Sequence, residues 1–357
     1  MTDGPARAGR FVFASPFPLE SGASLPGLEL AYRAWGRLAP TADNAVVVCH
    51  ALTGSSDVPA WWPALFGPGR ALDPGRDFVV CVDAPGSCHG STGPASPAAD
   101  GAPWGARFPA LTVRDLVNAQ RALLDALGVR AVRLVTGGSL GGMQALEWAL
   151  LDARVGAAAV IAAPARHEAW AIAWSDAQRR ALAADPAWPD EPARATAGLA
   201  AARAIAMLSY RSPRSFAARF GRRPGERTPF AVGDWLAHHG DALVARFDPA
   251  SYAALLGVMD THDVGAGRGG VAAALGRLAT PVLVLGIGSD HLYPSHEIEA
   301  LAAALPRGEL AWLRSPHGHD AFLLDQADVN RELLRFRARL DSKPAASRES
   351  AGTGAIR

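Results

Sequence analysis

The sequence predicts an α/β protein with a mostly parallel central sheet. Runs that are apolar except for the terminal Asp83 recur along the chain at 45–49, 78–83 and 281–287, as expected for strands buried on both faces. A stretch with helical spacing of its apolar residues, 112–124, lies between two such runs. This alternation of strand and helix is typical of parallel strands joined by right-handed crossovers.

The other predicted elements complete this pattern. Residues 28–36 alternate between apolar and polar side chains, which predicts an early strand buried on one face. Further strands are expected at 131–135, 155–161 and 309–313, and helices at 143–150 and near 320–340.

Composition favours a globular enzyme that acts on a small molecule. Apolar residues make up 49% of 357, and the formal charge is +1, with 35 Lys and Arg against 34 Asp and Glu. Such a balance offers no basic field for nucleic acid. No signal peptide or membrane-spanning run is apparent, so we expect a cytoplasmic protein. Cys49, Cys81 and Cys88 have no metal-ligand spacing, which predicts neither a disulfide framework nor a metal site.

The spacing of the strands predicts one core with an insertion. Residues 1–165 and 277–340 should form the core, and 166–276, rich in Ala and Arg with no strand pattern, an inserted helical lid. Lids of this kind close an active site against water. Helices that merely pad the fold would leave the size of the insertion unexplained. The tail, 341–357, is expected to be disordered.

The segment Gly137-Gly138-Ser139-Leu140-Gly141-Gly142 stands between a predicted strand and a predicted helix. In that context G-x-S-x-G indicates a nucleophile elbow, in which the serine occupies a strained turn. Ser139 is therefore the candidate nucleophile. The alternative is that Ser139 only caps the helix and the glycines make an ordinary turn.

Two later loops supply a base and its carboxylate in the order used by α/β-hydrolase sheets, serine, then acid, then histidine. Asp290 follows the strand that ends at 287, and His319 follows the next strand. His317 and His291 compete for the role of base. We prefer His319 because Gly318 frees the turn before it and a helix starts directly after it.

An oxyanion needs two backbone N–H donors. One should come from the residue after the nucleophile, Leu140, and the other from the turn after the early buried strand, at Leu52.

Taken together, several segments resemble the homoserine O-acetyltransferases of methionine biosynthesis, a family with the α/β-hydrolase fold. The resemblance runs from about residue 11 to 340 and is carried by His50-Ala51-Leu52-Thr53-Gly54, Trp61-Trp62, Gly67-Pro68-Gly69, Gly86–Pro94, Gly137–Trp148, Ser289-Asp290 and Gly318–Leu323.

The resemblance implies a ping-pong reaction. Ser139 would take the acetyl group from acetyl-CoA, a co-substrate, and pass it to the hydroxyl of L-homoserine, with His319 as base and Asp290 as its partner. No tightly bound cofactor is implied. Arg203 and Tyr210 match the family's residues for the amino-acid substrate, and Asp320 matches the aspartate that would hold its amine. A homodimer through the lid helices is also implied.

Asp320 has an alternative role as a carboxylate at a helix N-terminus, and Arg203 one as a solvated helix residue. The sequence also departs from the family at Asp83-Ala84-Pro85-Gly86-Ser87 and at Cys88-His89. Because these residues lie where an acyl donor approaches, succinyl-CoA remains an alternative donor, as in some relatives, and other relatives act on serine. A serine esterase and a non-catalytic binding protein on this fold are the alternatives from other classes. A lid with Arg203 and Asp320 favours the transferase.

Overall fold

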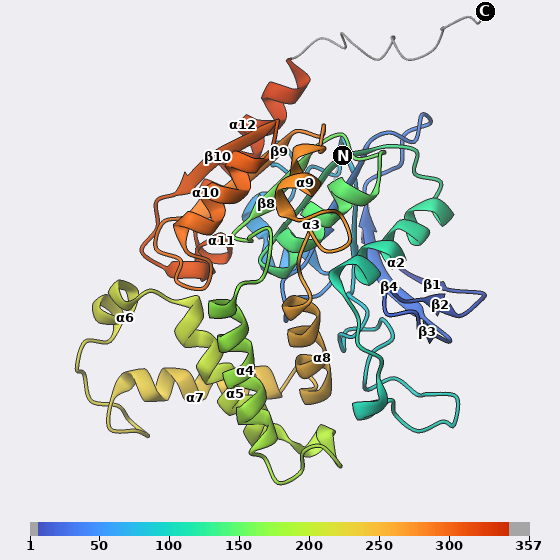
Figure 1. Cartoon of the computed structure of the whole chain (residues 1–357). Coiled ribbons are helices and arrows are strands. Elements are labelled where there is room, and N and C mark those ends of the chain that lie inside the picture. Colours follow the sequence, from blue (N-terminus) through green and yellow to red (C-terminus); the bar gives the residue numbers. More distant parts are fainter. Residues whose placement is uncertain (1–5, 343–357) are drawn as a thin grey trace, which may run out of the picture.

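A computed structural model of the chain describes residues 6–342. Its centre is an eight-stranded sheet in the order β1-β4-β6-β5-β7-β8-β9-β10, with helices on both faces (Figure 1). The strands are β1 Arg7–Val12, β4 Glu29–Trp35, β5 Ala45–Cys49, β6 Phe78–Val82, β7 Val132–Gly138, β8 Ala158–Ile161, β9 Val282–Ile287 and β10 Gly308–Leu313, and a separate hairpin pairs β2 Phe17–Pro18 with β3 Ser24–Leu25.

Strands β6 to β10 pair in parallel, whereas β1 and β4 add antiparallel strands at one edge. The predicted α/β class is therefore confirmed. Strand β1 was not predicted, because its alternate side chains are exposed and none is fully buried. An edge strand held by backbone hydrogen bonds to β4 leaves no apolar pattern in the sequence.

The helices join and cover these strands. They are α1 Val58–Trp61, α2 Val113–Ala126, α3 Leu140–Leu151, α4 Ala169–Ala183, α5 Thr196–Tyr210, α6 Pro213–Arg219, α7 Ala231–Val244, α8 Pro249–Asp260, α9 Val271–Gly276, α10 Ser295–Ala304, α11 Ala321–Leu324 and α12 Gln326–Asp341, with short 3-10 turns η1 Pro63–Leu65, η2 Gly105–Arg107, η3 Pro192–Arg194 and η4 Gly318–Asp320.

Several predicted boundaries differ from the structure, among them those of β7, β8 and the closing helix. Strand β7 continues through Gly138, because Gly137 pairs with Cys49 of β5 and Gly138 pairs with Ile161 of β8. Strand β8 begins at Ala158 rather than 155, since Gly156 follows an isolated bridge at Val155. The closing helix is broken into α11 and α12 at Asp325 (φ −95°, ψ 48°), and α12 includes Asp341. The rest of the predicted tail, 343–357, lies outside the described residues.

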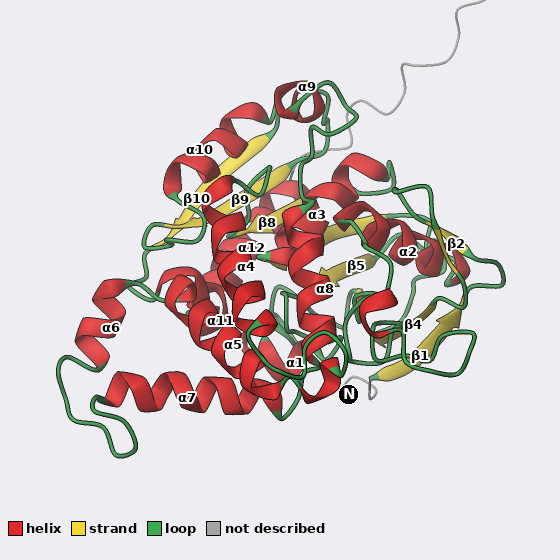
Figure 2. Cartoon of the chain, turned by 60° about the horizontal axis from the view of Figure 1, so that its bottom comes forward, coloured by secondary structure: helices red, strands yellow, loops and turns green. Residues whose placement is uncertain are grey.

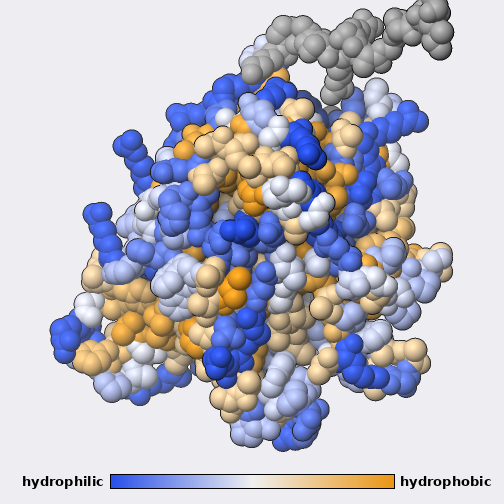
Figure 3. Space-filling view, viewed as in Figure 1, coloured by the Kyte–Doolittle hydropathy of each residue, from blue (hydrophilic) through white to orange (hydrophobic). Residues whose placement is uncertain are grey.

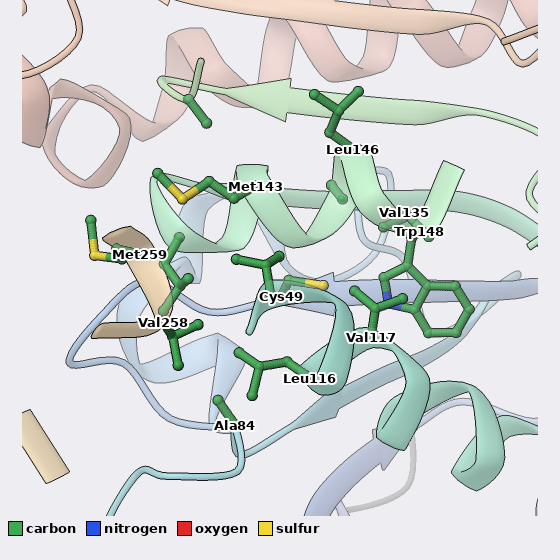
Figure 4. Close-up of a cluster of buried hydrophobic side chains, with 14 of the residues drawn as sticks. Cys49, Ala84, Leu116, Val117, Val135, Met143, Leu146, Trp148, Val258 and Met259 are labelled. Carbon is green, nitrogen blue, oxygen red and sulfur yellow. The ribbon is translucent and has the colours of Figure 1, made fainter. Parts of the chain in front are cut away.

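The core has two layers, one on each face of the sheet. In β5, Val47 packs into one layer while Val46 and Val48 pack into the other, as the period of two along a strand requires. Figure 4 shows the first layer around α3, where Met143 and Trp148 face labelled side chains of α2 and α8 and Leu146 points to the other side of the helix. Helix α3 is buried along nearly its whole length, so the turn that precedes it is firmly held.

The stretch between β8 and β9 is helical, and we call α4 to α8 the lid (Figures 1 and 2). Its two ends, residues 164–168 and 260–264, form a neck held by antiparallel backbone hydrogen bonds. His167 N–H donates to His262 O (2.8 Å) and Val264 N–H to Ala165 O (3.1 Å).

Helix α9 packs against α10. Apolar residues colour the lower left of Figure 3, over α6 and α7.

None of the helices within residues 6–342 is both long and apolar enough to span a membrane.

A substitution at Gly141 tests how closely β5 approaches the start of α3. A Cβ there would lie 2.1 Å from the carbonyl oxygen of Cys49, so backbone must move to admit it. We expect Gly141→Ala to lower the free energy of unfolding by about 1–3 kcal/mol, as overpacking does, measured by chemical denaturation.

The control for this prediction is Gly257→Ala in α8, where nothing lies within 4 Å of the added atom. This variant should be as stable as the parent or slightly more so, because alanine favours a helix over glycine. A Gly141→Ala variant with parental stability would contradict the argument.

Candidate active site

Ser139 lies at the turn between β7 and α3 with φ +58°, a conformation that non-glycine residues rarely adopt. Its N–H donates to Ile161 O of β8 (3.0 Å), which holds the strained backbone in place. The residue is 5% exposed, and its side chain does not cap α3. The turn thus has the geometry of a nucleophile elbow rather than of an ordinary helix cap.

Asp290 and His319 meet on the loops that follow β9 and β10. His319 Nδ1 lies 2.6 Å from Asp290 Oδ2, and both side chains are buried. Asp290 Oδ1 accepts the N–H groups of Leu292 (2.8 Å) and Tyr293 (3.1 Å). A carboxylate facing Nδ1 selects the tautomer with a proton on Nδ1, which leaves Nε2 as the basic atom.

The other two histidines considered for the base lie elsewhere. His317 Nδ1 lies 3.5 Å from the hydroxyl of Ser215, and His291 is exposed. Gly318 adopts φ +74°, and a Cβ there would meet backbone of Arg211 and Ser212 within 3 Å. Glycine is therefore required at that position, directly before the histidine that contacts Asp290.

The turn that carries Leu52 packs against the elbow. The position of a Cβ on Gly141 lies 2.1 Å from Cys49 O and 3.2 Å from His50 O, so the end of β5 touches the first turn of α3. Leu140 is the first residue of α3, where a helix offers no internal partner for the N–H. Both predicted oxyanion donors therefore belong to segments in direct contact.

His50 fixes the shape of that turn. Its Nδ1 lies 2.8 Å from Ala51 O, and its Nε2 accepts the N–H of Ala84 (2.9 Å). Burial lowers the pKa of His50, whereas the nearby Asp83 raises it. A neutral imidazole that donates at one nitrogen and accepts at the other joins the ends of β5 and β6.

The three predicted substrate residues come together beside His319. The guanidinium of Arg203 lies over the Tyr210 ring, 5.4 Å from its centroid, and the Tyr210 ring lies 5.7 Å from that of His319. Arg203 Nε is buried with no hydrogen-bond partner among residues 6–342. Arg203 is thus not an ordinary solvated helix residue.

Asp320 is the N-cap residue of α11, but its side chain makes no capping hydrogen bond. Its Oδ2 instead lies 3.7 Å from Nη1 of Arg211. Burial raises the pKa of Asp320, while the charges of Arg203, His319 and Arg211 lower it. Its carboxylate therefore contributes to the electrostatics of the site, and a helix-capping role does not account for it.

This arrangement combines a strained serine, a histidine–aspartate pair, a turn rich in backbone N–H groups, and separate cationic and anionic side chains. Such a set can support acyl transfer through a covalent intermediate. No cluster of three or more His, Cys, Asp or Glu suited to a metal ion occurs in the described part of the chain.

Comparison with known proteins agrees with this geometry. Residues 44–326 match the model of the alpha/beta hydrolase fold family. A homoserine O-acetyltransferase of Salinibacter ruber is 49% identical over 343 residues, covering 92% of this chain and 97% of the relative. The chain belongs to the homoserine O-acetyltransferase family.

Two solved structures also resemble this chain. The homoserine O-acetyltransferase of Staphylococcus aureus is 29% identical with a TM-score of 0.79, covering 96% of this chain and 98% of that one. The acetyl esterase MekB is 28% identical with a TM-score of 0.81, covering 94% and 97%. Transferases and esterases thus share this architecture.

Sequence reasoning did not find several residues that organise this site. Ser289 donates to Ser315 O (2.7 Å) and accepts from Gly318 N–H (3.0 Å), so it ties the Asp290 loop to the His319 loop. Arg211, next to the predicted Tyr210, faces Asp320. In both cases the available signal was a polar residue next to a predicted site residue in the sequence. That signal does not say which residue the side chain contacts.

Buried and half-buried histidines should make stability depend on pH. Burial lowers the pKa of His50, His89, His167, His239 and His262, to about 3 for His167 and about 4 for His239. Below about pH 6.5 the unfolded chain binds protons that the folded chain does not. The free energy of unfolding should therefore fall as the pH drops from about 6.5 to about 4.5, although Asp320, with its raised pKa, acts in the opposite direction.

His167→Asn should make that dependence shallower by up to about 1.4 kcal/mol per pH unit, because one proton difference is removed. Denaturant titrations across this range measure the slope. His291→Asn, which removes an exposed imidazole, is the control. An equal change of slope in both variants would argue against the buried imidazole as its source.

Proposed function

We propose that this chain is a homoserine O-acetyltransferase that moves an acetyl group from acetyl-CoA to the hydroxyl of L-homoserine through Ser139. The observation that supports this most strongly is the site itself. Asp290 and His319 are in contact, and the Tyr210 ring lies against His319. Arg203, whose Nε has no hydrogen-bond partner within residues 6–342, lies over that Tyr210 ring. Membership of the family supplies the identity of the reaction.

In the first half-reaction His319 Nε2 takes the proton of the Ser139 hydroxyl, and Oγ attacks the thioester carbonyl. The N–H groups of Leu52 and Leu140 stabilise the oxyanion that forms. As the C–S bond breaks, His319 returns the proton to the departing thiolate. The acetyl group is left as an ester on Ser139, and CoA leaves as a thiol.

In the second half-reaction His319 takes the proton of the homoserine hydroxyl, whose oxygen attacks the acetyl ester. The same two N–H groups hold the second oxyanion. When the ester bond to Ser139 breaks, His319 returns the proton to Oγ, and O-acetylhomoserine leaves. Asp290 stabilises the imidazolium in both halves. Acetyl-CoA is a co-substrate in this route, which calls for no tightly bound cofactor.

The lid supplies recognition of the acceptor in this proposal. The guanidinium of Arg203 offers a fork of donors to the carboxylate of homoserine, beside Tyr210. The carboxylate of Asp320 faces the amine. A lid also shields the acetyl-enzyme from water, which a transferase requires. We further propose a homodimer formed through the lid helices, where Leu208 and Phe230 are exposed, and a cytoplasmic location, where acetyl-CoA is available.

An esterase is the second candidate, because an acetyl esterase shares the architecture. It would need only Ser139, Asp290 and His319 and would gain nothing from Arg203 and Asp320. A succinyl donor is the alternative within the family.

The deciding measurement mixes the purified chain with homoserine and either acetyl-CoA or succinyl-CoA and follows the release of free thiol. We expect release from acetyl-CoA that depends on homoserine, and no turnover in Ser139→Ala with an unchanged fold. Thiol release that ignores homoserine would exclude the transferase, and faster release from succinyl-CoA would change only the donor.

Arg203→Lys should raise the KM for homoserine about 10- to 100-fold, because one charge-assisted hydrogen bond contributes about 1.5–3 kcal/mol. Steady-state kinetics at saturating acetyl-CoA measure it. Arg180→Lys on α4, whose parent side chain is 80% exposed, is the matched control and should leave KM unchanged. An unaltered KM in Arg203→Lys would remove Arg203 from substrate recognition.

A further inference from the structure

The turn that carries Leu52 is closed by a hydrogen bond of its own. Gly54 N–H donates to Ala51 O (2.8 Å), so residues 51–54 form one tight turn, which we call the oxyanion turn. The N–H of Leu52 donates to no backbone carbonyl within residues 6–342. It is therefore available to a ligand, and the direction in which it points depends on what holds the turn.

Core residues fix both flanks of the oxyanion turn. Before the turn, His50 Nε2 accepts the N–H of Ala84 (2.9 Å). After the turn, the buried carboxylate of Asp83 accepts the N–H of Ser56 at Oδ1 (2.6 Å) and its hydroxyl at Oδ2 (2.9 Å). None of these hydrogen bonds reaches the two residues in the middle of the turn.

The middle of the oxyanion turn is bonded to the lid instead. Arg246, between α7 and α8, donates from Nη1 to Thr53 O (2.7 Å) and from Nη2 to Thr53 Oγ1 (3.3 Å). Two contacts from one planar guanidinium fix the orientation of their partner as well as its position. Because Thr53 O and Gly54 N–H belong to one planar peptide group, holding that carbonyl also holds the N–H that closes the turn.

Neighbouring side chains place Arg246 for this contact. The next residue, Phe247, is 5% exposed, and its ring centroid lies 5.4 Å from that of His89 and 6.3 Å from that of Tyr252, edge to face in both pairs. The carbonyl of Arg246 accepts a weak hydrogen bond from the thiol of Cys88 (3.9 Å). The backbone at Arg246 is thus held against the loop that follows β6, and the guanidinium extends from there to the oxyanion turn.

We propose that Arg246 is a positioning residue through which the lid orients the oxyanion turn, and with it the N–H of Leu52, for the oxyanion that forms during acyl transfer. This role needs no contact between Arg246 and either substrate. The lid then takes part in the chemical step as well as in recognition of the acceptor. The inference rests on the proposed acyl transfer and on Leu52 as one of its two N–H donors.

The test follows acetylation of Ser139 by acetyl-CoA without homoserine, in which one equivalent of thiol is released in a burst. The Ser139 oxygen bonds to the acetyl carbon, the C–S bond breaks, and the Ser139 proton passes through His319 to the departing thiolate. Arg246→Ala should lower the maximal burst rate about tenfold, since loss of a whole oxyanion donor costs about a hundredfold or more and a displaced donor part of that. The acetyl-CoA concentration that gives half the maximal rate should not change.

A parental burst rate in Arg246→Ala would overturn the proposal. A raised half-saturating concentration with an unchanged maximal rate would also overturn it, because that pattern indicates that Arg246 binds the donor. A parent that gives no burst would contradict the acetyl-enzyme of the proposed function, and this is a separate failure from an unaltered rate in the variant.

Chemical rescue separates positioning from a general loss of structure. Millimolar guanidinium chloride should restore part of the burst rate of Arg246→Ala, because the free ion can occupy the place of the lost side chain and donate to Thr53 O. Sodium chloride at the same concentration should not restore it. Equal effects of the two salts would mean that the defect does not come from the lost guanidinium contacts, contrary to the proposal.

Arg307→Ala is the matched control. Arg307 is exposed, as Arg246 is, and it also donates from Nη1 to a backbone carbonyl, that of Ala279 (3.2 Å). It precedes β10 at the amino end of a parallel strand, whereas the site lies at the carboxyl ends. The control should show the parental burst rate, and an equal loss in it would overturn the proposal. If Arg246→Ala does not fold, Arg246→Met, which retains the apolar stem without a donor, decides the question by the burst rate and the half-saturating concentration.

Discussion

The close approach of the Cys49 carbonyl to the first turn of α3 is the contact on which the site depends. An ideal Cβ on Gly137 would lie 2.4 Å from that oxygen, and one on Gly141 would lie 2.1 Å from it. No residue with a side chain could approach the oxygen so closely. The end of β5 and the start of α3 therefore share one small volume. Because Leu52 follows the first and Leu140 begins the second, the same contact that packs sheet against helix also brings together the segments that carry the two proposed N–H donors.

The lid is joined to this arrangement at more than its neck. Arg246, in the segment between α7 and α8, donates to the carbonyl of Thr53 (2.7 Å) on the turn that carries Leu52. On the opposite side, Tyr210 of α5 lies against the His319 ring. Lid residues thus contact both the turn that carries Leu52 and the ring of His319. A movement of the lid would displace these proposed catalytic groups as well as change access to them.

The sequence predicted the parts of the site that follow from sheet topology. Ser139, Asp290 and His319 each follow a parallel strand, and the carboxyl ends of such strands lie at one edge of the sheet, so their order along the chain implied proximity. The pairing of Tyr293 with His167 was not predictable, because 126 residues separate them and no periodic pattern links them. Strand β1 was not predicted for a different reason. It pairs with β4 through backbone hydrogen bonds, which do not require an apolar side-chain pattern.

The hydrogen bonds of Asp290 leave no room for an amide at this position. One oxygen accepts two backbone N–H groups, and the other faces Nδ1 of His319. An asparagine would present its NH2 either to those two donors, where nothing can accept it, or to His319. In the second case it would force the ring into the opposite tautomer and place a proton on Nε2, the nitrogen proposed to receive one. The groups around Asp290 therefore require a hydrogen-bond acceptor at each of its two side-chain oxygen positions. The carboxylate is therefore specified as strongly by the fold of its own loop as by the chemistry of the imidazole.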